Sequence, residues 1–196
     1  MTARRSGAYA CLVHTTPTTP VRLTAGSLTL RPWAPEDAAV LAGLYEDEAM
    51  RRWAGAPVHD EPSAARWVAE QHRGWETGER LAFAVEEASD ARPVGHVVLK
   101  RPAASAAPAE VGYWTAAHAR GRGVAPRALA AVADWAFAAF AREGLTRLDL
   151  LHQVDNTASC RVAEKSGFTL SGLLPAAPPD FPLDGHRHTR QAPSSA

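Results

Sequence analysis

Apolar and polar positions follow a strand period in some segments of the chain and a helix period in others. Residues 27–33 alternate leucine with polar neighbours, which predicts a strand. Pro35, Glu36 and Asp37 follow, and proline and acidic groups both suit the first turn of a helix. We therefore expect a helix from this point to about Met50.

The middle of the chain continues this alternation of elements. Helical spacing predicts a second helix from Glu61 to about Trp75. Two apolar runs, Leu81–Val85 and Val94–Leu99, are predicted to be strands joined by a polar turn at Ser89–Asp90. Glu110–Thr115 is the third strand expected in this series.

The clearest helical pattern lies after this third strand, where the apolar residues are Leu129, Val132, Ala133, Ala136, Phe137 and Phe140. Their spacing of three and four positions predicts a helix with one buried face. A nearly continuous apolar run, Leu145–Leu151, then predicts a buried strand. A short helix is expected over Asn156–Ser166, ending at Gly167.

The length of 196 residues fits one domain with short ends. Residues 1–26 contain no acidic residue and no apolar period, so we expect a flexible leader. The domain core is expected over residues 27–174. Residues 175–196 contain five of the fifteen prolines, which remove backbone donors, so we expect an irregular tail with a degenerate final strand pair.

Charge and cysteine content exclude several classes of protein. The 21 basic and 21 acidic residues balance, which argues against nucleic acid or an anionic membrane as a partner. The apolar stretch Ala8–Val13 is too short for a signal peptide or a membrane span, so a cytoplasmic protein is expected. Cys11 and Cys160 form no metal-binding spacing, and we expect no metal.

A loop rich in glycine and arginine, residues 120–126, joins the third strand to the long helix. Glycine lets the backbone approach a ligand closely, and the free amides at a helix start attract anions, so phosphate is the expected ligand. The alternative is a tight turn with solvated arginines. Pro126 stands where a dinucleotide-binding fingerprint needs its third glycine, which argues against that class.

Three motifs carry a resemblance to a known family: Arg120-x-x-Gly123-x-Ala125, Asn156-x-x-Ser159 followed by Glu164–Phe168, and Leu28–Trp33 followed by Glu36-Asp37-Ala38. The first resembles the pyrophosphate loop of the GNAT acyl-CoA N-acyltransferase superfamily. The other two resemble its Rim-type branch, the ribosomal-protein N-terminal acetyltransferases. The resemblance covers about residues 27–174.

The resemblance implies an α/β (α+β) fold of three layers, in which helices flank a mixed, largely antiparallel sheet. A V-shaped cleft between the strands at 110–115 and 145–151 would take acetyl-CoA. A β-bulge near Tyr113 and Trp114 would leave backbone groups free for the co-substrate. The implied cofactor-binding residues are Tyr113, Trp114, Thr115, Arg120, Gly121, Arg122, Gly123, Val124, Ala125 and Asn156.

The resemblance also suggests the catalytic groups. Ser159 matches the serine near the CoA sulfur, where it would donate to the leaving thiolate, although Asn156 and Ser159 would equally suit a helix cap and first turn. Glu110 is the preferred general base, with a solvated strand end as the alternative. His152 and Asp155 are further candidates for the base.

The activity implied is transfer of an acetyl group to a primary amine, either a protein or peptide N-terminal α-amine or a small-molecule amine. The acidic run Glu46–Glu48 would attract a cationic acceptor or form a solvated face. A non-catalytic acyl-CoA-binding domain is the alternative from another class. A monomer or homodimer is expected, without metal.

Overall fold

The computed structural model of the chain describes residues 19–55, 58–88, 90–101 and 108–193. Its centre is an open sheet with the strand order β1-β2-β3-β4-β5-β6-β8-β7. The strands are β1 (Leu23–Ala25), β2 (Leu28–Pro32), β3 (Arg80–Glu87), β4 (Asp90–Lys100), β5 (Ala109–Thr115), β6 (Arg147–Gln153), β7 (Thr169–Leu174) and β8 (Gly185–Gln191). Neighbouring strands are antiparallel except β5 and β6, which are parallel.

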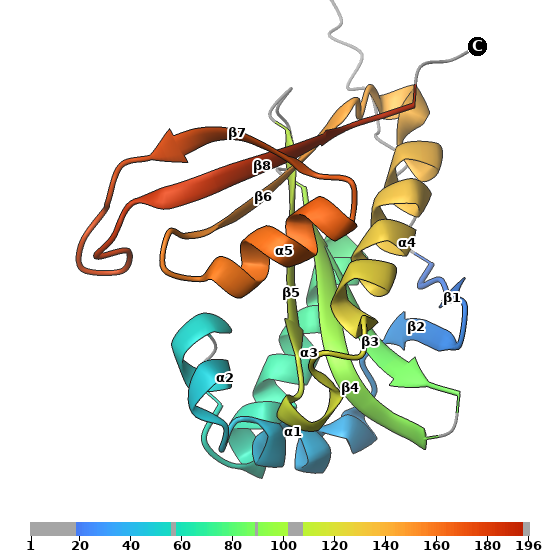
Figure 1. The fold of residues 1–196 in the computed structure, drawn as a ribbon. Helices are drawn as coiled ribbons and strands as arrows, with labels where there is room; N and C mark the ends of the chain where they lie inside the picture. Colours follow the sequence, from blue (N-terminus) through green and yellow to red (C-terminus); the bar gives the residue numbers. More distant parts are fainter. Residues whose placement is uncertain (1–18, 56–57, 89, 102–107, 194–196) are drawn as a thin grey trace, which may run out of the picture.

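Helices cover both faces of this sheet, which confirms the expected three-layer fold (Figure 1). The helices are η1 (Pro35–Asp37), α1 (Ala38–Leu44), α2 (Glu48–Trp53), α3 (Glu61–Thr77), η2 (Ala117–Ala119), α4 (Val124–Ala139), η3 (Ala141–Glu143) and α5 (Thr157–Lys165). Helices α1, α2 and α3 share one apolar core with one side of the sheet. Helices α4 and α5 share a second core with the other side.

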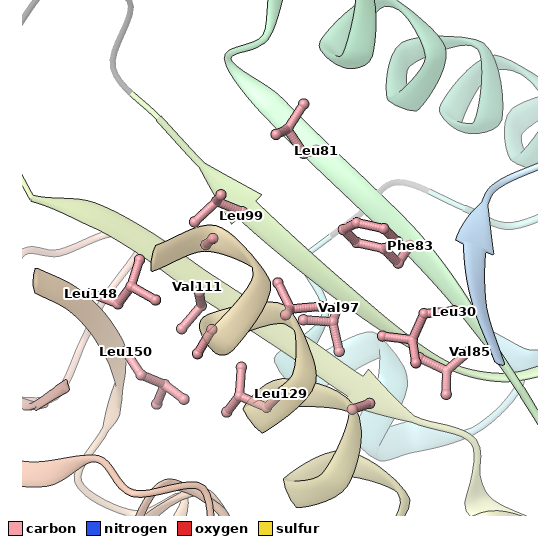
Figure 2. Close-up of a cluster of buried hydrophobic side chains, with 14 of the residues drawn as sticks. Leu30, Leu81, Phe83, Val85, Val97, Leu99, Val111, Leu129, Leu148 and Leu150 are labelled. Atoms are coloured by element: carbon pink, nitrogen blue, oxygen red, sulfur yellow. The ribbon is translucent and has the colours of Figure 1, made fainter. Parts of the chain in front are cut away.

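Strand β3 shows how the sequence separates the two cores. Leu81, Phe83 and Val85 join the core under α4, whereas Ala82 and Ala84 join the core under α1 and α3. Successive side chains of a strand point to opposite faces, so this alternation of large and small residues serves both layers. Figure 2 shows the first core, in which Leu129 of α4 lies over the side chains of the central strands.

The helix expected from Pro35 to Met50 is interrupted. After α1 ends at Leu44, Asp47 adopts an extended conformation and accepts a hydrogen bond from the Met50 N–H at 3.0 Å. This N-cap starts α2 as a separate helix. The acidic run Glu46–Glu48 therefore lies at a helix junction rather than on a continuous helix face.

The boundaries expected at both ends are wrong within the described residues. Leu23–Ala25 forms β1, which pairs with β2, so the sheet begins inside the segment expected to be a leader. Residues 1–18 lie outside the described residues. At the other end, Gly185–Gln191 forms a full strand paired with β6 on one side and β7 on the other.

The tail was expected to be irregular because of its prolines, and their position explains the difference. The prolines at 175, 178, 179 and 182 all lie in the connection between β7 and β8, and β8 contains none. A backbone ladder needs free N–H groups rather than apolar side chains, so the polar sequence of β8 still pairs fully.

Strands β5 and β6 separate after a short paired stretch, and this separation positions the candidate site. They pair only from Ala109↔Leu148 to Val111↔Leu150, although β5 continues to Thr115 and β6 to Gln153. Figure 1 shows β6 turning away from β5. The β-bulge expected at Tyr113 and Trp114 is wrong, because the described ladder from β4 to β5 has no register shift. Divergence from β6, rather than a bulge, leaves the β5 edge without a strand partner.

Candidate functional site

The glycine-rich loop has the geometry of an anion site. Gly121 and Gly123 have φ angles of +75° and +73°, in the left-handed region that favours glycine. Gly123 is the N-cap of α4 and has no side chain to bond the first-turn N–H groups. Those N–H groups have no partner within a helix, so the start of α4 presents donors and a positive dipole end.

Carboxylates hold both arginines of this loop. Arg120 forms a two-pronged ion pair with Asp47, and its Nε donates to the Thr115 carbonyl oxygen at 3.2 Å. Arg122 Nη2 lies 2.7 Å from Glu87 Oε2. The hydrogen bond from Arg120 holds the pKa of Asp47 below its usual range. The arginines therefore brace the loop, and the backbone amides remain for an anion.

Ser159 and Tyr113 form a pair where β5 and β6 diverge. The Ser159 Oγ lies 2.9 Å from the Tyr113 hydroxyl, which joins α5 to β5. Ser159 is buried and Tyr113 is partly buried. Burial raises the pKa of Tyr113, so the phenol keeps its proton at neutral pH. Both residues are expected at the site from the sequence, but their contact is not predictable from it, because 46 positions separate them.

Asn156 serves as the N-cap of α5, since its Oδ1 accepts a hydrogen bond from the Ser159 N–H at 3.2 Å. The structure therefore shows Asn156 in the capping role. The cap fixes the first turn of α5, and with it the direction in which the Ser159 hydroxyl points toward β5.

The structure does not bring Glu110 to this pair. Its Oε1 lies 2.5 Å from Lys100 Nζ. Glu110 is three residues from Tyr113, about 10 Å along a strand, and its side chain points to the opposite face of the sheet. A base at this position would have to release Lys100 and act through water.

The remaining expected residues on β5 contribute in different ways. The Trp114 side chain is buried in the core under α1 and α3, where it stacks on His96 with ring centroids 5.5 Å apart. Only its backbone is therefore available to a ligand. The buried hydroxyl of Thr115 has no hydrogen-bond partner among the described residues.

The two further candidates for the base lie in separate surroundings. Asp155 pairs with Arg52 at 2.7 Å on the surface. His152 belongs to a cluster with Cys160, His186 and His188, in which one ligand-type atom from each residue lies within 4.8 Å of the others. The sequence does not predict this cluster, because its members come from β6, α5 and β8 and follow no recognised spacing.

Comparisons with known proteins agree with this architecture. Residues 27–169 match the sequence profile of the acetyltransferase (GNAT) domain. Mycobacterium smegmatis RimJ, solved in complex with CoA-disulfide, is 27% identical with a TM-score of 0.73, covering 89% of this chain and 86% of that one. A search of curated protein sequences found no match.

Two further structures share the fold at 20% identity and a TM-score of 0.72. RimL, a ribosomal L7/L12 α-N-protein acetyltransferase in complex with coenzyme A, aligns over 89% of this chain and 100% of its own. The microcin C7 self-immunity acetyltransferase MccE, in complex with acetyl-CoA and AMP, aligns over 85% and 93%.

Within the described residues, no helix has the length and apolar character needed to cross a membrane. The family profile covers most of the chain, and its span includes the glycine loop, the diverging strands and the Tyr113–Ser159 pair. The chain therefore belongs to the GNAT acetyltransferase family.

Proposed function

We propose that the protein transfers an acetyl group from acetyl-CoA to a primary amine, either a protein or peptide N-terminal α-amine or a small-molecule amine. The observation that carries this proposal is the Tyr113–Ser159 pair, a partly buried pair of hydroxyl groups at the divergence of β5 and β6. The GNAT family of the chain and its RimJ neighbour bound to CoA-disulfide support the same activity.

Acetyl-CoA would bind along the loop and the free edge of β5. The backbone amides of residues 122–125 would hold the pyrophosphate at the positive end of α4. The pantetheine would run past the backbone of residues 113–115, where β6 no longer supplies partners. This path leads the thioester toward Ser159.

The chemical step joins the amine nitrogen to the thioester carbonyl carbon and then breaks the carbon–sulfur bond. Ser159 would donate its hydroxyl proton in a hydrogen bond to the leaving thiolate. Tyr113 would act as a positioning residue, because its phenol can donate to Ser159 Oγ and so turn the serine proton toward the sulfur. The amine loses one proton in the same reaction.

Removal of that proton is the role proposed for Glu110, acting through water after release of Lys100. The demand on the base depends on the acceptor, since an α-amine has a pKa near 8 and a lysine near 10.4. The Glu110→Gln variant should therefore lose activity chiefly at neutral pH and recover part of it at high pH. An unchanged pH profile would show that water, His152 or Asp155 acts as the general base instead.

Thiol release from acetyl-CoA tests the activity. The purified protein is incubated with acetyl-CoA and a panel of peptides with free N-termini, N-terminally blocked lysine peptides, polyamines and aminoglycosides. We expect amine-dependent release of CoA thiol and an acetylated product detected by mass spectrometry. Thermal stabilisation by acetyl-CoA without turnover on any amine would instead identify a non-catalytic binding domain.

A further inference from the structure

Three histidines and a cysteine meet between α5 and the β6–β8 strand pair, outside the contact between Tyr113 and Ser159. We propose that His152, Cys160, His186 and His188 bind one divalent metal ion of the zinc class, in a tetrahedral site with four protein ligands. This proposal reverses the expectation from sequence that the protein carries no metal. It does not depend on the proposed transferase activity.

Strand register brings the three imidazoles together. His152 of β6 lies opposite His186 of β8, and His188 lies opposite Leu150. Residues two apart on a strand point to the same face, so all three rings share the face on which α5 packs. Ring centroids of His152 and His188 are 5.1 Å apart in a stacked arrangement. Figure 1 shows α5 running beside β6 and β8. Cys160 belongs to α5.

The distances around the sulfur match a metal site. Cys160 Sγ lies 3.6 Å from His152 Nε2 and 3.3 Å from His186 Nδ1. Zinc bonds of about 2.3 Å to sulfur and 2.0–2.1 Å to nitrogen, at tetrahedral angles, place sulfur and nitrogen about 3.5 Å apart. A thiol could satisfy both contacts by donating its proton to one ring and accepting one from the other, and a thiolate with two imidazoles could satisfy them by sharing one cation. The unpaired ring nitrogens of His188 favour the cation.

His188 gives an independent indication of a ligand. Its side chain is buried, with the residue 1% exposed, and neither ring nitrogen has a hydrogen-bond partner among the described residues. Buried polar groups in proteins are almost always paired, and an unpaired one calls for a specific explanation. A metal ion at the centre of the cluster would satisfy one of these nitrogens.

The hydrogen bond of His152 also suits a ligand. His152 Nδ1 lies 2.8 Å from the Gln153 carbonyl oxygen, which can only accept a proton. Nδ1 therefore carries the hydrogen in the neutral ring, and the lone pair of Nε2 points toward Cys160. Metal-binding histidines typically use their second nitrogen in this way.

The proposed ion would fix α5 to the sheet. Cys160 follows Ser159 directly, and α5 has only nine residues, so a bond from Cys160 to strands β6 and β8 would hold the turn that presents Ser159 to Tyr113. Four protein ligands leave no open position for substrate, which is typical of a structural zinc site. One soft thiolate with three imidazoles favours zinc over magnesium or calcium.

Metal titration of tag-free protein tests the site. Protein stripped with a chelator and dialysed is titrated with Zn²⁺, and metal content is measured after removal of free ion. We expect one bound zinc per chain and, at 100 times the dissociation constant, a rise in Tm of about 5–10 °C. With Co²⁺, we expect a thiolate-to-cobalt charge-transfer band together with the intense visible bands of a tetrahedral complex.

Variants assign the ligands. Cys160→Ser and His186→Gln should each weaken zinc binding at least about 100-fold, since each removes a direct ligand. The matched controls are Cys11→Ser, the other cysteine of the chain, and His59→Ala, an exposed histidine outside the cluster; both should bind like the wild type. If a ligand variant fails to fold, the cobalt spectra of the wild type and of Cys11→Ser still decide.

Three results would overturn the proposal: no zinc binding by the stripped wild-type protein at micromolar concentration, a cobalt complex without the thiolate band, or undiminished binding in folded Cys160→Ser and His186→Gln. Each of these readouts is independent of acetyl transfer, so failure of the metal site and failure of the proposed function are distinguishable.

Discussion

Ser159 has two contacts that belong to different roles. Its backbone N–H bonds the Asn156 side chain and so helps to start α5, while its hydroxyl meets the Tyr113 phenol. Replacing the side chain with alanine removes only the second contact. Backbone capping and hydroxyl chemistry can therefore be separated at this one position.

The Ser159→Ala variant should lower kcat by roughly 10²- to 10⁴-fold, the usual cost of losing a positioned proton donor. Its affinity for acetyl-CoA should change little, because the loop amides remain. Steady-state kinetics and acetyl-CoA titration measure the two quantities. Near wild-type turnover in Ser159→Ala would show that this residue acts only in the first turn of the helix.

Tyr113→Phe should reduce kcat by roughly tenfold, the effect of one positioning hydrogen bond.

His96 is a buried histidine that the fold keeps neutral. It accepts a hydrogen bond from Trp33 Nε1 at 3.0 Å and stacks on Trp114. Burial, followed by the positive charges of Arg80 and Lys100, places the pKa of His96 well below its usual 6.5. The unfolded chain therefore binds a proton that the folded protein does not.

The free energy of unfolding should consequently fall as the pH drops below 6.5, with His96 contributing up to about 1.4 kcal/mol per pH unit. Urea unfolding of the wild type and of His96→Gln at pH 7.5 and 5.5 measures this contribution. The variant should lose less stability over this interval, because it lacks the His96 imidazole. The other titrating groups are common to both proteins and cancel in the comparison. Equal pH dependence in the two proteins would show that His96 does not titrate on unfolding.

At the scale of elements, helix α4 depends on how its first turn begins. Gly123 occupies the left-handed region at the N-cap, and an added Cβ would meet nothing closer than 3.9 Å. A side chain therefore fits sterically, at the cost of backbone strain. A charged group there would stand directly before the first-turn amides.

Gly123→Asp should abolish acetyl-CoA binding, because its carboxylate would repel the pyrophosphate and compete for the same N–H groups. Differential scanning fluorimetry measures the binding as a ligand-induced rise in Tm, about 5–10 °C for the wild type at 100 times the dissociation constant. Gly144→Asp is the matched control, since Gly144 also has a positive φ and open space around it. If acetyl-CoA still raises the Tm of folded Gly123→Asp, the pyrophosphate binds elsewhere on the protein.

The whole molecule depends on its last strand. β8 lies between β6 and β7, so the chain returns from the edge of the sheet to fill an interior position. It supplies His186 and His188 and pairs with β6 from Arg147↔Gln191 to Gln153↔Gly185. The C-terminal segment is therefore part of the domain rather than an appendage.

Ending the chain after Pro179 should prevent stable folding, because removal of β8 leaves backbone groups of both β6 and β7 unpaired. Ending it after Pro193 keeps β8 and should preserve the wild-type Tm. Thermal unfolding and size-exclusion chromatography compare the two truncations. A cooperative unfolding transition at the wild-type Tm in the shorter protein would contradict the role given to β8.

Local patterns predicted the elements whose periodicity is strong, including α3, β5 and α4. Prediction was weaker where the apolar period was interrupted or absent. The helix expected to reach Met50 breaks at Asp47, because a side-chain cap within an acidic run starts a new helix there. Strand β8 was expected only as part of a degenerate strand pair, because polar residues dominate it and prolines precede it.

The sequence by itself determined the local framework of the candidate site: a strand, two glycines suited to positive φ, a helix with an uncapped start, and Asn156 at the head of α5. These features depend on neighbours a few positions apart, so residue types specify them. Tertiary structure alone decided that Tyr113 meets Ser159, that Glu110 faces away from them, and that three histidines surround Cys160. Such contacts depend on strand order and register, which arise from the packing of the whole sheet and leave no periodic signal in the chain.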